Sequence, residues 1–390
     1  MVQGTVAITL NGEVHYYGTA DHIDIPAGVI HQISNVGEKP AVFVEMICGE
    51  IYHDEKDRII KPSANITAQS LGLGLEPFVK MQPELKSYIW GGTKLCDLYG
   101  KRCASTTVAE SWELSAHPAG QSTVATGRYK GMPFGMYLRT VGKEVLGWKC
   151  QSLAEFPLLV KFIDAREDLS IQVHPGDEYA LENEREYGKN EMWYIIDCEP
   201  DAKLYIGFNR DVSAEEVRKR IRDNTILEVL NQVPTKPGDV FFIPAGTVHA
   251  IGAGNFICEI QQSSNSTYRL YDYDRRDAQG NLRELHLEKA LEVLDLKRYV
   301  QPASRQENPD GDGLLSECKY FTASIHDVDK SVELKMDESS FLSVVCLEGK
   351  GTLASSKLVQ TIRAGDCFFV PANEDSLRAE GKMKIIALGV

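Results

Sequence analysis

Short stretches of alternating apolar and polar residues recur along the chain and predict β-strands. The stretch GTVAITLNGEVHYYG alternates on both sides of Asn11-Gly12, a dipeptide that favours a two-residue β-hairpin. The stretch FLSVVCLEGKGTLASSKLVQTI, nearer the C-terminus, has a similar pattern. Most of the chain is therefore expected to form strands, and the fold class is predicted to be mainly β.

Helical patterns are few. The segment SAEEVRKRIRDNTILEVLNQV begins with Ser213, and Glu216 follows three residues later, which is a capping-box pattern at a helix start. The segment RELHLEKALEVLDL places its apolar residues on one helical face, namely Leu287, Ala290, Leu291 and Leu294. Helices are expected within residues 213–233 and 283–296.

One phrase occurs three times, as a turn, a short apolar strand and then Pro-Ala. The copies are ADHIDIPAGVIHQISN (Ala20–Asn35), PGDVFFIPAGTVHAIG (Pro237–Gly252) and AGDCFFVPANEDSLRA (Ala364–Ala379). Five residues after each proline come His31, His249 and Ser376. The repeat predicts a strand, a tight turn and a second strand that the histidine opens.

Residues able to bind a metal gather around the middle copy. Gln172 and His174 stand two apart, so a strand would project them from one face. A second strand carries Glu191, and the repeat supplies His249. Four nitrogen and oxygen ligands suit Zn²⁺ and leave room for water or substrate. Taken singly, each residue has a plainer interpretation, such as an ion pair between Glu191 and Lys189.

Three cations accompany this ligand set. Lys161 lies in the apolar strand LLVKFIDA, where a lysine is costly unless it is paired. Lys189 is expected to share the strand and the face of the glutamate two residues later. Arg269 lies in STYRLYDYDR and could instead pair with Asp272 or Asp274. An anionic ligand such as a phosphate would need cations of this kind.

The overall charge restricts the class of partner. The chain has 390 residues and a formal net charge of -14, which argues against nucleic-acid and anionic-membrane partners. Its nine cysteines include no C-x-x-C pair, and the N-terminus has no signal-peptide pattern. We therefore expect a cytoplasmic protein.

The repeat resembles the second motif of the cupin superfamily, G-x5-P-x-G-x2-H-x3-N. The middle copy matches at Gly238, Pro244, Gly246 and His249, and Ala253 replaces the final Asn. In the third copy Asn373 and Ser376 replace the glycine and histidine. The resemblance implies jelly-roll barrels and a third copy without a metal.

Longer stretches resemble the type I mannose-6-phosphate isomerase family in its short bacterial form. They include PLLVKFIDAREDLSIQVHPGDEYA, YGKNEMWYIID and EIQQSSNSTYRLYDYDR. The resemblance implies one zinc per chain, bound by Gln172, His174, Glu191 and His249. It also implies that Lys161 and Lys189 bind the sugar phosphate and that Arg269 is catalytic. The activity implied is interconversion of mannose 6-phosphate and fructose 6-phosphate through a cis-enediol.

Three domains are expected: a partial cupin-like fragment (1–60), a catalytic cupin domain with helical segments (76–300) and a metal-free cupin-like domain (315–390). The first resembles a fragment of the C-terminal cupin of mannose-1-phosphate guanylyltransferases and lacks a first cupin motif, so His31 is expected to be structural or vestigial. Half a jelly roll leaves strand edges unpaired. The fragment is therefore expected to dock on the rest of the chain or on a second copy, as a homodimer.

Two other functions fit the same residues. A metal-dependent dioxygenase would use His174, Glu191 and His249 as its triad, although a fourth ligand argues against it. A non-catalytic sugar-phosphate sensor would not require so complete a ligand set. For the isomerase, the general base stays open among a metal-bound hydroxide, the neighbourhood of His249 and a carboxylate.

Overall fold

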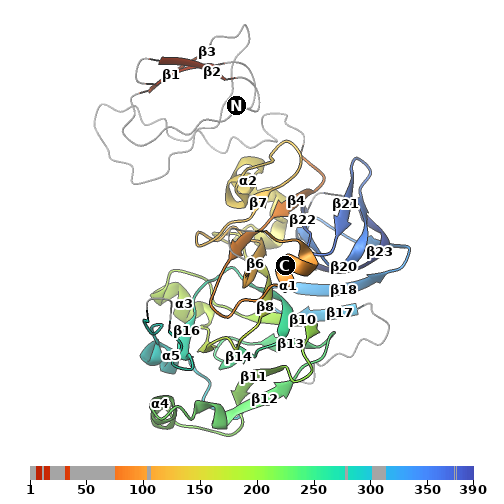
Figure 1. Ribbon diagram of the computed structural model, residues 1–390. Coiled ribbons are helices and arrows are strands. Elements are labelled where there is room, and N and C mark those ends of the chain that lie inside the picture. The colour runs from red at the N-terminus through yellow and green to blue at the C-terminus, as the bar shows by residue number, and fades with distance from the viewer. Residues whose placement is uncertain are drawn as a thin grey trace. The chain divides into compact units, whose positions relative to one another are not determined.

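The computed structural model contains two compact units, Met1–Asn65 and Ile66–Val390. The residues that it describes are 6–10, 13–17, 31–35, 75–102, 107–276, 280–300, 313–372, 374 and 376–390. Most of the two predicted linkers, 61–77 and 301–315, and Asn373 of the third repeat lie outside these residues. Figure 1 shows the elements of each unit, and they are described separately below.

Three antiparallel strands form the described part of the first unit, in the order β2-β1-β3. They are β1 (Val6–Leu10), β2 (Glu13–Tyr17) and β3 (His31–Asn35). Leu10 pairs with Glu13, which confirms the two-residue hairpin predicted at Asn11-Gly12. Ile8 is buried and lies opposite Ile33. The side chain of His31 lies outside the described residues, and the likeness to guanylyltransferases stays a prediction.

A six-stranded antiparallel sheet forms one wall of the second unit. Its strands, in order, are β13 (Val240–Ile243), β10 (Glu191–Cys198), β15 (Asn255–Gln262), β8 (Leu158–Ala165), β6 (Glu110–Leu114) and β5 (Glu84–Lys86). Every residue of β8 and β15 is buried, because both faces of the sheet are covered. The few charged side chains on these strands must therefore find partners inside the protein.

A five-stranded sheet faces the first. Its strands, in order, are β12 (Leu230–Pro234), β11 (Lys203–Phe208), β14 (His249–Ile251), β9 (Ile171–Val173) and β16 (Tyr268–Tyr271). Trp193 and Ile195 of the six-stranded sheet pack in one core with Leu204 and Ile251 of the five-stranded sheet. The two sheets thus form a β-sandwich, and its interior holds the residues discussed below.

A third sheet of the second unit combines strands from both ends of the unit. Its strands, in order, are β17 (Gly313–Glu317), β18 (Thr322–Val328), β23 (Leu377–Gly389), β20 (Leu342–Ala354), β22 (Cys367–Val370), β4 (Val79–Gln82) and β7 (Thr123–Val124). Two more strands, β19 (Ser331–Leu334) and β21 (Val359–Arg363), pair with β23 and β20. A large core joins this sheet to the six-stranded sheet and includes Phe162 and Phe369.

The helices are short and cover the sheets. They are α1 (Lys94–Tyr99), α2 (Phe134–Val141), α3 (Asp177–Asn183), α4 (Ala214–Arg222) and α5 (Leu287–Val293), with 3-10 turns η1 (Lys143–Leu146), η2 (Trp148–Cys150) and η3 (Ile226–Val229). Val217 of α4 and Ala290 of α5 pack on the outer face of the five-stranded sheet. None of the helices in the described ranges is long and apolar enough to cross a membrane.

The helix expected within residues 213–233 is α4, and its predicted start is confirmed. The Ser213 Oγ accepts a hydrogen bond from the Glu216 backbone N–H at 3.1 Å, as the capping box requires. The helix ends at Arg222, because Asn224 adopts a left-handed φ of 55° that a helix cannot continue. The remaining residues form η3 and β12. The mainly β fold class is confirmed.

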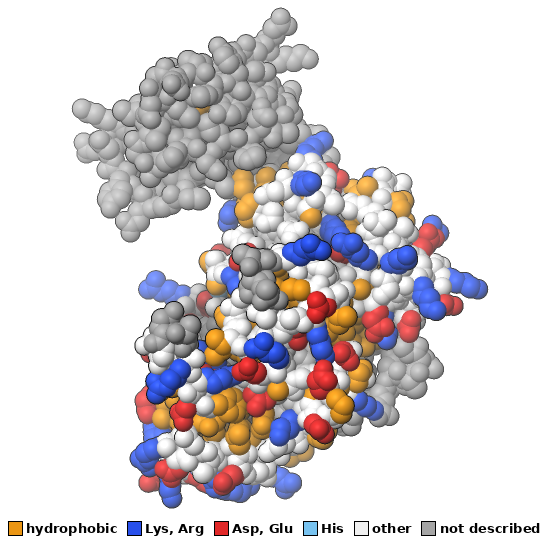
Figure 2. Space-filling model, in the orientation of Figure 1, with side chains coloured by type: hydrophobic (Ala, Val, Ile, Leu, Met, Phe, Trp, Pro, Cys, Tyr) orange, Lys and Arg blue, Asp and Glu red, His pale blue; other side chains and the backbone are white. Residues whose placement is uncertain are grey.

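Charges of both signs are interspersed over the face that Figure 2 shows. Acidic and basic side chains alternate there with apolar and uncharged ones. Among the described residues, no single-sign charged patch is visible on this face.

Candidate metal centre

Pairing of β9 with its two neighbours places three predicted site residues in one row. Gln172 lies directly opposite His249 of β14 on one side and Arg269 of β16 on the other. Directly paired residues of antiparallel strands project from the same face. His174 follows β9 and comes two residues after Gln172, so it continues that face.

The six-stranded sheet contributes a second row. Trp193 pairs with Glu259, Glu259 pairs with Lys161, and Lys161 pairs with Trp112. Glu191 stands two residues before Trp193 and shares its face. Because Trp193 packs against the five-stranded sheet, this face points into the β-sandwich.

The repeated turn fixes the position of one ligand relative to another. Gly246 has a left-handed φ of 87°, which favours glycine, and its backbone N–H donates to the His174 carbonyl at 2.8 Å. The chain then enters β14 at His249, as the repeat predicted. The turn thereby ties the segment that carries His174 to the segment that carries His249.

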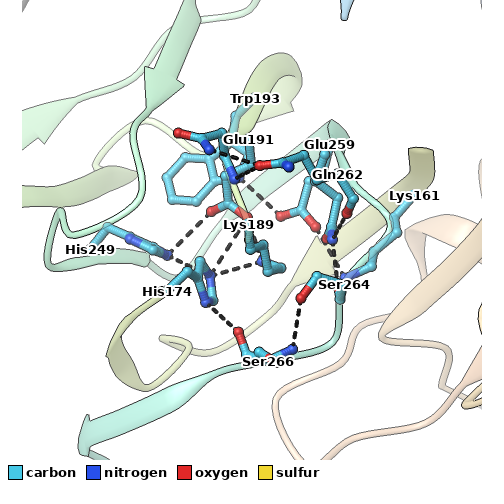
Figure 3. A network of polar contacts seen from close by, with 12 residues as sticks. Lys161, His174, Lys189, Glu191, Trp193, His249, Glu259, Gln262, Ser264 and Ser266 are labelled. Atoms are coloured by element: carbon cyan, nitrogen blue, oxygen red, sulfur yellow. Dashed lines mark hydrogen bonds and ion pairs between the residues drawn. The ribbon is translucent and has the colours of Figure 1, made fainter. Parts of the chain in front are cut away.

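His174, Glu191 and His249 converge inside the β-sandwich (Figure 3). The Nε2 atoms of the two histidines are 3.1 Å apart. Glu191 Oε1 lies 3.2 Å from His249 Nε2, and Glu191 Oε2 lies 3.6 Å from His174 Nε2. All three residues are buried. Gln172 lies beside them on the face of His249 and is only partly buried.

Backbone carbonyls determine which ring nitrogen of each histidine carries a proton. His174 Nδ1 lies 3.0 Å from the Ser266 carbonyl oxygen, and His249 Nδ1 lies 2.8 Å from that of Thr247. A carbonyl only accepts, so each Nδ1–H donates and each Nε2 presents a lone pair. Burial lowers the pKa of both imidazoles, that of His249 to about 3, so both rings are neutral.

These lone pairs need a cation. Two Nε2 acceptors and a carboxylate meet in a buried space, and Glu191 Oε1 has no hydrogen-bond partner among the described residues. Such a cluster repels itself unless a positive charge lies within it. The donor set of two imidazoles and one carboxylate suits a divalent metal ion. The residues present therefore fit a metal site.

Lys189 supplies a positive charge at this place. Its Nζ is 2.5 Å from Glu191 Oε2 and 2.8 Å from His174 Nε2. The prediction that Lys189 lies on the strand of Glu191 is wrong, because β10 begins at Glu191. Lys189 instead precedes the strand, and its backbone N–H bonds to the Pro175 carbonyl. The plainer interpretation, an ion pair with Glu191, is thus also present. Burial raises the pKa of Glu191 to about 7, although Lys189 opposes this shift.

Lys161 has the carboxylate partners that a buried ammonium requires. Its Nζ lies 3.1 Å from Glu259 and 3.7 Å from Glu110, and 5.1 Å from the centre of the Trp112 ring. Burial alone would lower its pKa, but the two carboxylates raise the pKa of Lys161 above its usual value. Sequence analysis missed Glu259, which also accepts from Trp193 Nε1 at 3.0 Å. A glutamate within the apolar stretch NFICEIQQ was the available signal.

Arg269 does not make the ion pairs that the sequence left open. Its Nη1 donates to the Glu284 carbonyl at 2.7 Å, and its buried Nε has no hydrogen-bond partner in the described ranges. Asp272 is already taken by Arg275 and Arg283. Burial and the neighbouring Arg283 lower the pKa of Arg269. Arg269, which pairs with Gln172, therefore holds a buried donor with no partner among the described residues.

Comparisons with known proteins agree with these residues. Residues 78–197 match the family Phosphomannose isomerase type I, catalytic domain, and residues 313–389 match Mannose-6-phosphate isomerase, cupin domain. Mannose-6-phosphate isomerase ManA of Bacillus subtilis is 40% identical over 312 residues, covering 78% of this chain and 96% of that protein. Mannose-6-phosphate isomerase of Streptococcus mutans is 37% identical over 79% of this chain and 96% of that protein.

Solved structures show the same relationship. The crystal structure of the mannose 6-phosphate isomerase from Bacillus subtilis superimposes with a TM-score of 0.75 at 36% identity, covering 81% of this chain and 100% of that one. A phosphomannose isomerase variant from Salmonella typhimurium superimposes with a TM-score of 0.64 at 18% identity, covering 80% of this chain and 99% of that one, and so shares the fold. The cupin architecture inferred from the repeat is confirmed. The chain is a member of the type I phosphomannose isomerase family.

Proposed function

We propose that this chain interconverts mannose 6-phosphate and fructose 6-phosphate with one bound Zn²⁺. The observation that carries the proposal is the meeting of two Nε2 lone pairs and an unpartnered carboxylate oxygen inside the β-sandwich. Two relatives that this chain matches over 96% of their own length are named mannose-6-phosphate isomerase. A dioxygenase could use the same triad, but the family relationship favours the isomerase.

Gln172, His174, Glu191 and His249 would hold the ion. Two neutral imidazoles, a neutral amide and one carboxylate would leave a site of net charge +1 with Zn²⁺. When bound, the ion supplies positive charge beside the sugar oxygens that become negative during the reaction. It would also take the ligand atoms that Lys189 now contacts. The ammonium of Lys189 would then be free for the anionic substrate.

The reaction moves a proton between C1 and C2 of the sugar through a cis-enediol, so it needs a base. Burial would raise the pKa of Glu259, but Lys161 and Lys189 outweigh this and lower it. Glu259 therefore stays ionised and lies outside the group of metal ligands. We assign it as the carboxylate available for proton transfer. Its contact with Lys161 would bring that lysine to the substrate as well.

Arg269 would stabilise the negative charge of the enediolate. Its side chain lies in the row of Gln172 and His249, and its Nε has no partner among the described residues. A planar guanidinium can bond two oxygens at once, which suits the paired oxygens of an enediolate. The positive charge of Arg269 would stabilise the negative charge that develops in the transition state more strongly than it stabilises the uncharged carbonyl and hydroxyl groups of the sugar.

Metal analysis combined with a coupled isomerase assay tests the proposal. The expected result is one zinc per chain, turnover of mannose 6-phosphate, and loss of both after chelation with recovery on adding Zn²⁺. Glu191→Gln should bind zinc weakly, because it removes the one carboxylate ligand. Iron with oxygen uptake would identify the dioxygenase, and sugar-phosphate binding without turnover would identify the sensor.

We further propose that the protein is cytoplasmic, that it binds a sugar phosphate and that it forms a homodimer. Seven cysteines in the described part of the chain are free, which suits a reducing compartment.

A further inference from the structure

The loop between β15 and β16 sets the orientation of the metal ligand His174. The Ser266 carbonyl in this loop accepts the Nδ1–H of His174 at 3.0 Å. If this carbonyl moved, the ring could rotate or change its tautomer, and Nε2 would no longer present a lone pair to the ion. The groups that hold the loop therefore bear on metal binding.

Glu186 holds the loop through three hydrogen bonds to one carboxylate oxygen. Its Oε2 accepts from the Asn265 backbone N–H at 2.9 Å, the Ser266 hydroxyl at 3.1 Å and the Ser264 hydroxyl at 3.2 Å. Glu186 lies between α3 and β10, and it is separate from the residues of the metal centre. Figure 3 shows Ser266 next to His174, and Ser264 in the same loop, between β15 and β16.

A histidine forms a hydrogen bond with the other carboxylate oxygen of Glu186. His117 Nε2 lies 3.2 Å from Glu186 Oε1, and His117 Nδ1 accepts the Ala119 backbone N–H at 3.1 Å. The proton of a neutral His117 must therefore be on Nε2, where it is donated to Glu186. Four donors thus surround this carboxylate. They lower the pKa of Glu186 to about 2, the hydrogen bond from His117 contributing most.

We propose that Glu186 is a positioning residue for the metal centre, which holds the Ser266 carbonyl so that His174 presents Nε2 to the ion. His117 and the loop hydroxyls fix the carboxylate in turn. The inference rests on the proposed zinc site. Altering a group that orients a metal ligand commonly changes metal affinity about 10- to 100-fold.

The substitution Glu186→Gln tests this role because an amide cannot accept from four donors. The NH₂ group of the glutamine amide would face either His117 or the loop, and on either side it would meet hydrogen-bond donors. We expect zinc affinity to fall about tenfold, measured by competition with a chromophoric chelator at a temperature where the metal-free variant is fully folded. Glu184→Gln is the matched control. Glu184 accepts from Tyr268 and Lys289 and makes no hydrogen bond to the loop backbone or serines.

Rescue by a small carboxylate separates positioning from general destabilisation. Glu186 and Ser266 line an open hollow of about 270 Å³, through which formate can reach the position of the carboxylate. Glu186→Ala should bind zinc weakly, and formate should restore part of the affinity in this variant only. Should Glu186→Gln not fold, Ser266→Ala replaces it, because it removes one donor to Glu186 and keeps the carbonyl.

The outcomes are distinct. Parent-like zinc affinity in folded Glu186→Gln and Ser266→Ala, with zinc and turnover normal in the parent, overturns this inference alone. If the parent chain itself binds no zinc, the proposed function fails and the inference fails with it. Weaker zinc binding in the Glu186 variants, unchanged binding in Glu184→Gln and recovery with formate support it.

Discussion

Gln172 and His249 lie directly opposite each other in the residue pair that joins β9 to β14. The pair brings together two segments that are far apart in sequence, and Arg269 extends the row on the other side. The geometry of the centre is therefore built on strand register, which single side-chain substitutions should leave intact.

Replacing His174 with alanine should remove bound zinc and nearly all isomerase activity while the fold persists. The change deletes one ligand, and the cores on both sides of the sheets do not depend on it. Metal content by mass spectrometry and circular dichroism check both parts. His326→Ala, in β18 of the third sheet, is the control. Stoichiometric zinc and normal turnover in His174→Ala would exclude this centre.

Arg269→Lys should lower kcat by about 10²-fold or more with zinc retained, because lysine keeps the charge and loses the planar fork. Arg276→Lys offers a control, since Arg276 donates to the Gly280 carbonyl at the surface. Steady-state kinetics with metal analysis on the same samples distinguish the two variants. An unchanged kcat in Arg269→Lys would leave this arginine with a structural role.

The carboxylate of Asp272 should make the free energy of unfolding depend on pH. Burial alone would raise its pKa, but the hydrogen bonds from Arg283 and Arg275 outweigh this and lower it below the usual 3.8. Asp272→Asn should therefore cost about 2 kcal/mol near neutral pH. The cost is fully present above the unfolded pKa and disappears as the pH falls through the lower folded value. Urea unfolding of parent and variant between pH 7 and pH 3 measures the difference. A difference that grows on acidification would contradict the sign.

Breaking the buried ion pair Lys101–Glu113 should lower the free energy of unfolding far more than breaking an ion pair at the surface. Lys101 Nζ lies 2.8 Å from Glu113 Oε2 and 2.6 Å from the Gly365 carbonyl, and Glu113 is fully buried. Lys101→Met leaves a buried carboxylate uncompensated and should cost about 3–5 kcal/mol. Adding Glu113→Gln should recover part of this. The exposed pair Lys297–Asp211 serves as comparison, and Lys297→Met should change the unfolding midpoint little.

Deleting the first unit should leave catalysis largely intact. A chain that begins at Glu76 keeps all of the proposed ligands and every strand of the second unit. Zinc content and activity are expected to match the parent, while solubility or oligomeric state should change. A truncated protein that folds and binds zinc but fails to turn over mannose 6-phosphate would place part of the active site in residues 1–60.

Local rules predicted the parts of the site that share one strand or one turn. The period of two placed Gln172 and His174 together, and the repeated turn placed His249 at the start of a strand. The partner of Lys161 could not be found in this way, because Glu259 meets it only through the register of β8 with β15. A buried lysine in an apolar strand indicated that a carboxylate was needed, but not which one.

The same limit applied to the loop that supports His174. Glu186 and His117 come from separate segments, and neither stands in a motif with the metal ligands. The end of α4 could not be predicted for a different reason. The apolar spacing continues past Arg222, but the left-handed Asn224 interrupts the helix, and the apolar residues that follow lie in the 3-10 turn η3 and in β12.

Strand β4 leaves the ribosome long before its partner β22, and Met81 pairs with Cys367 only when nearly the whole chain has been made. The third sheet must therefore close after synthesis, by joining the two ends of the second unit. Until then the edge of β4 that pairs with β22 is unpaired and open to other chains. Premature termination before β22 would leave a nascent enzyme that holds every proposed zinc ligand and still cannot complete its fold.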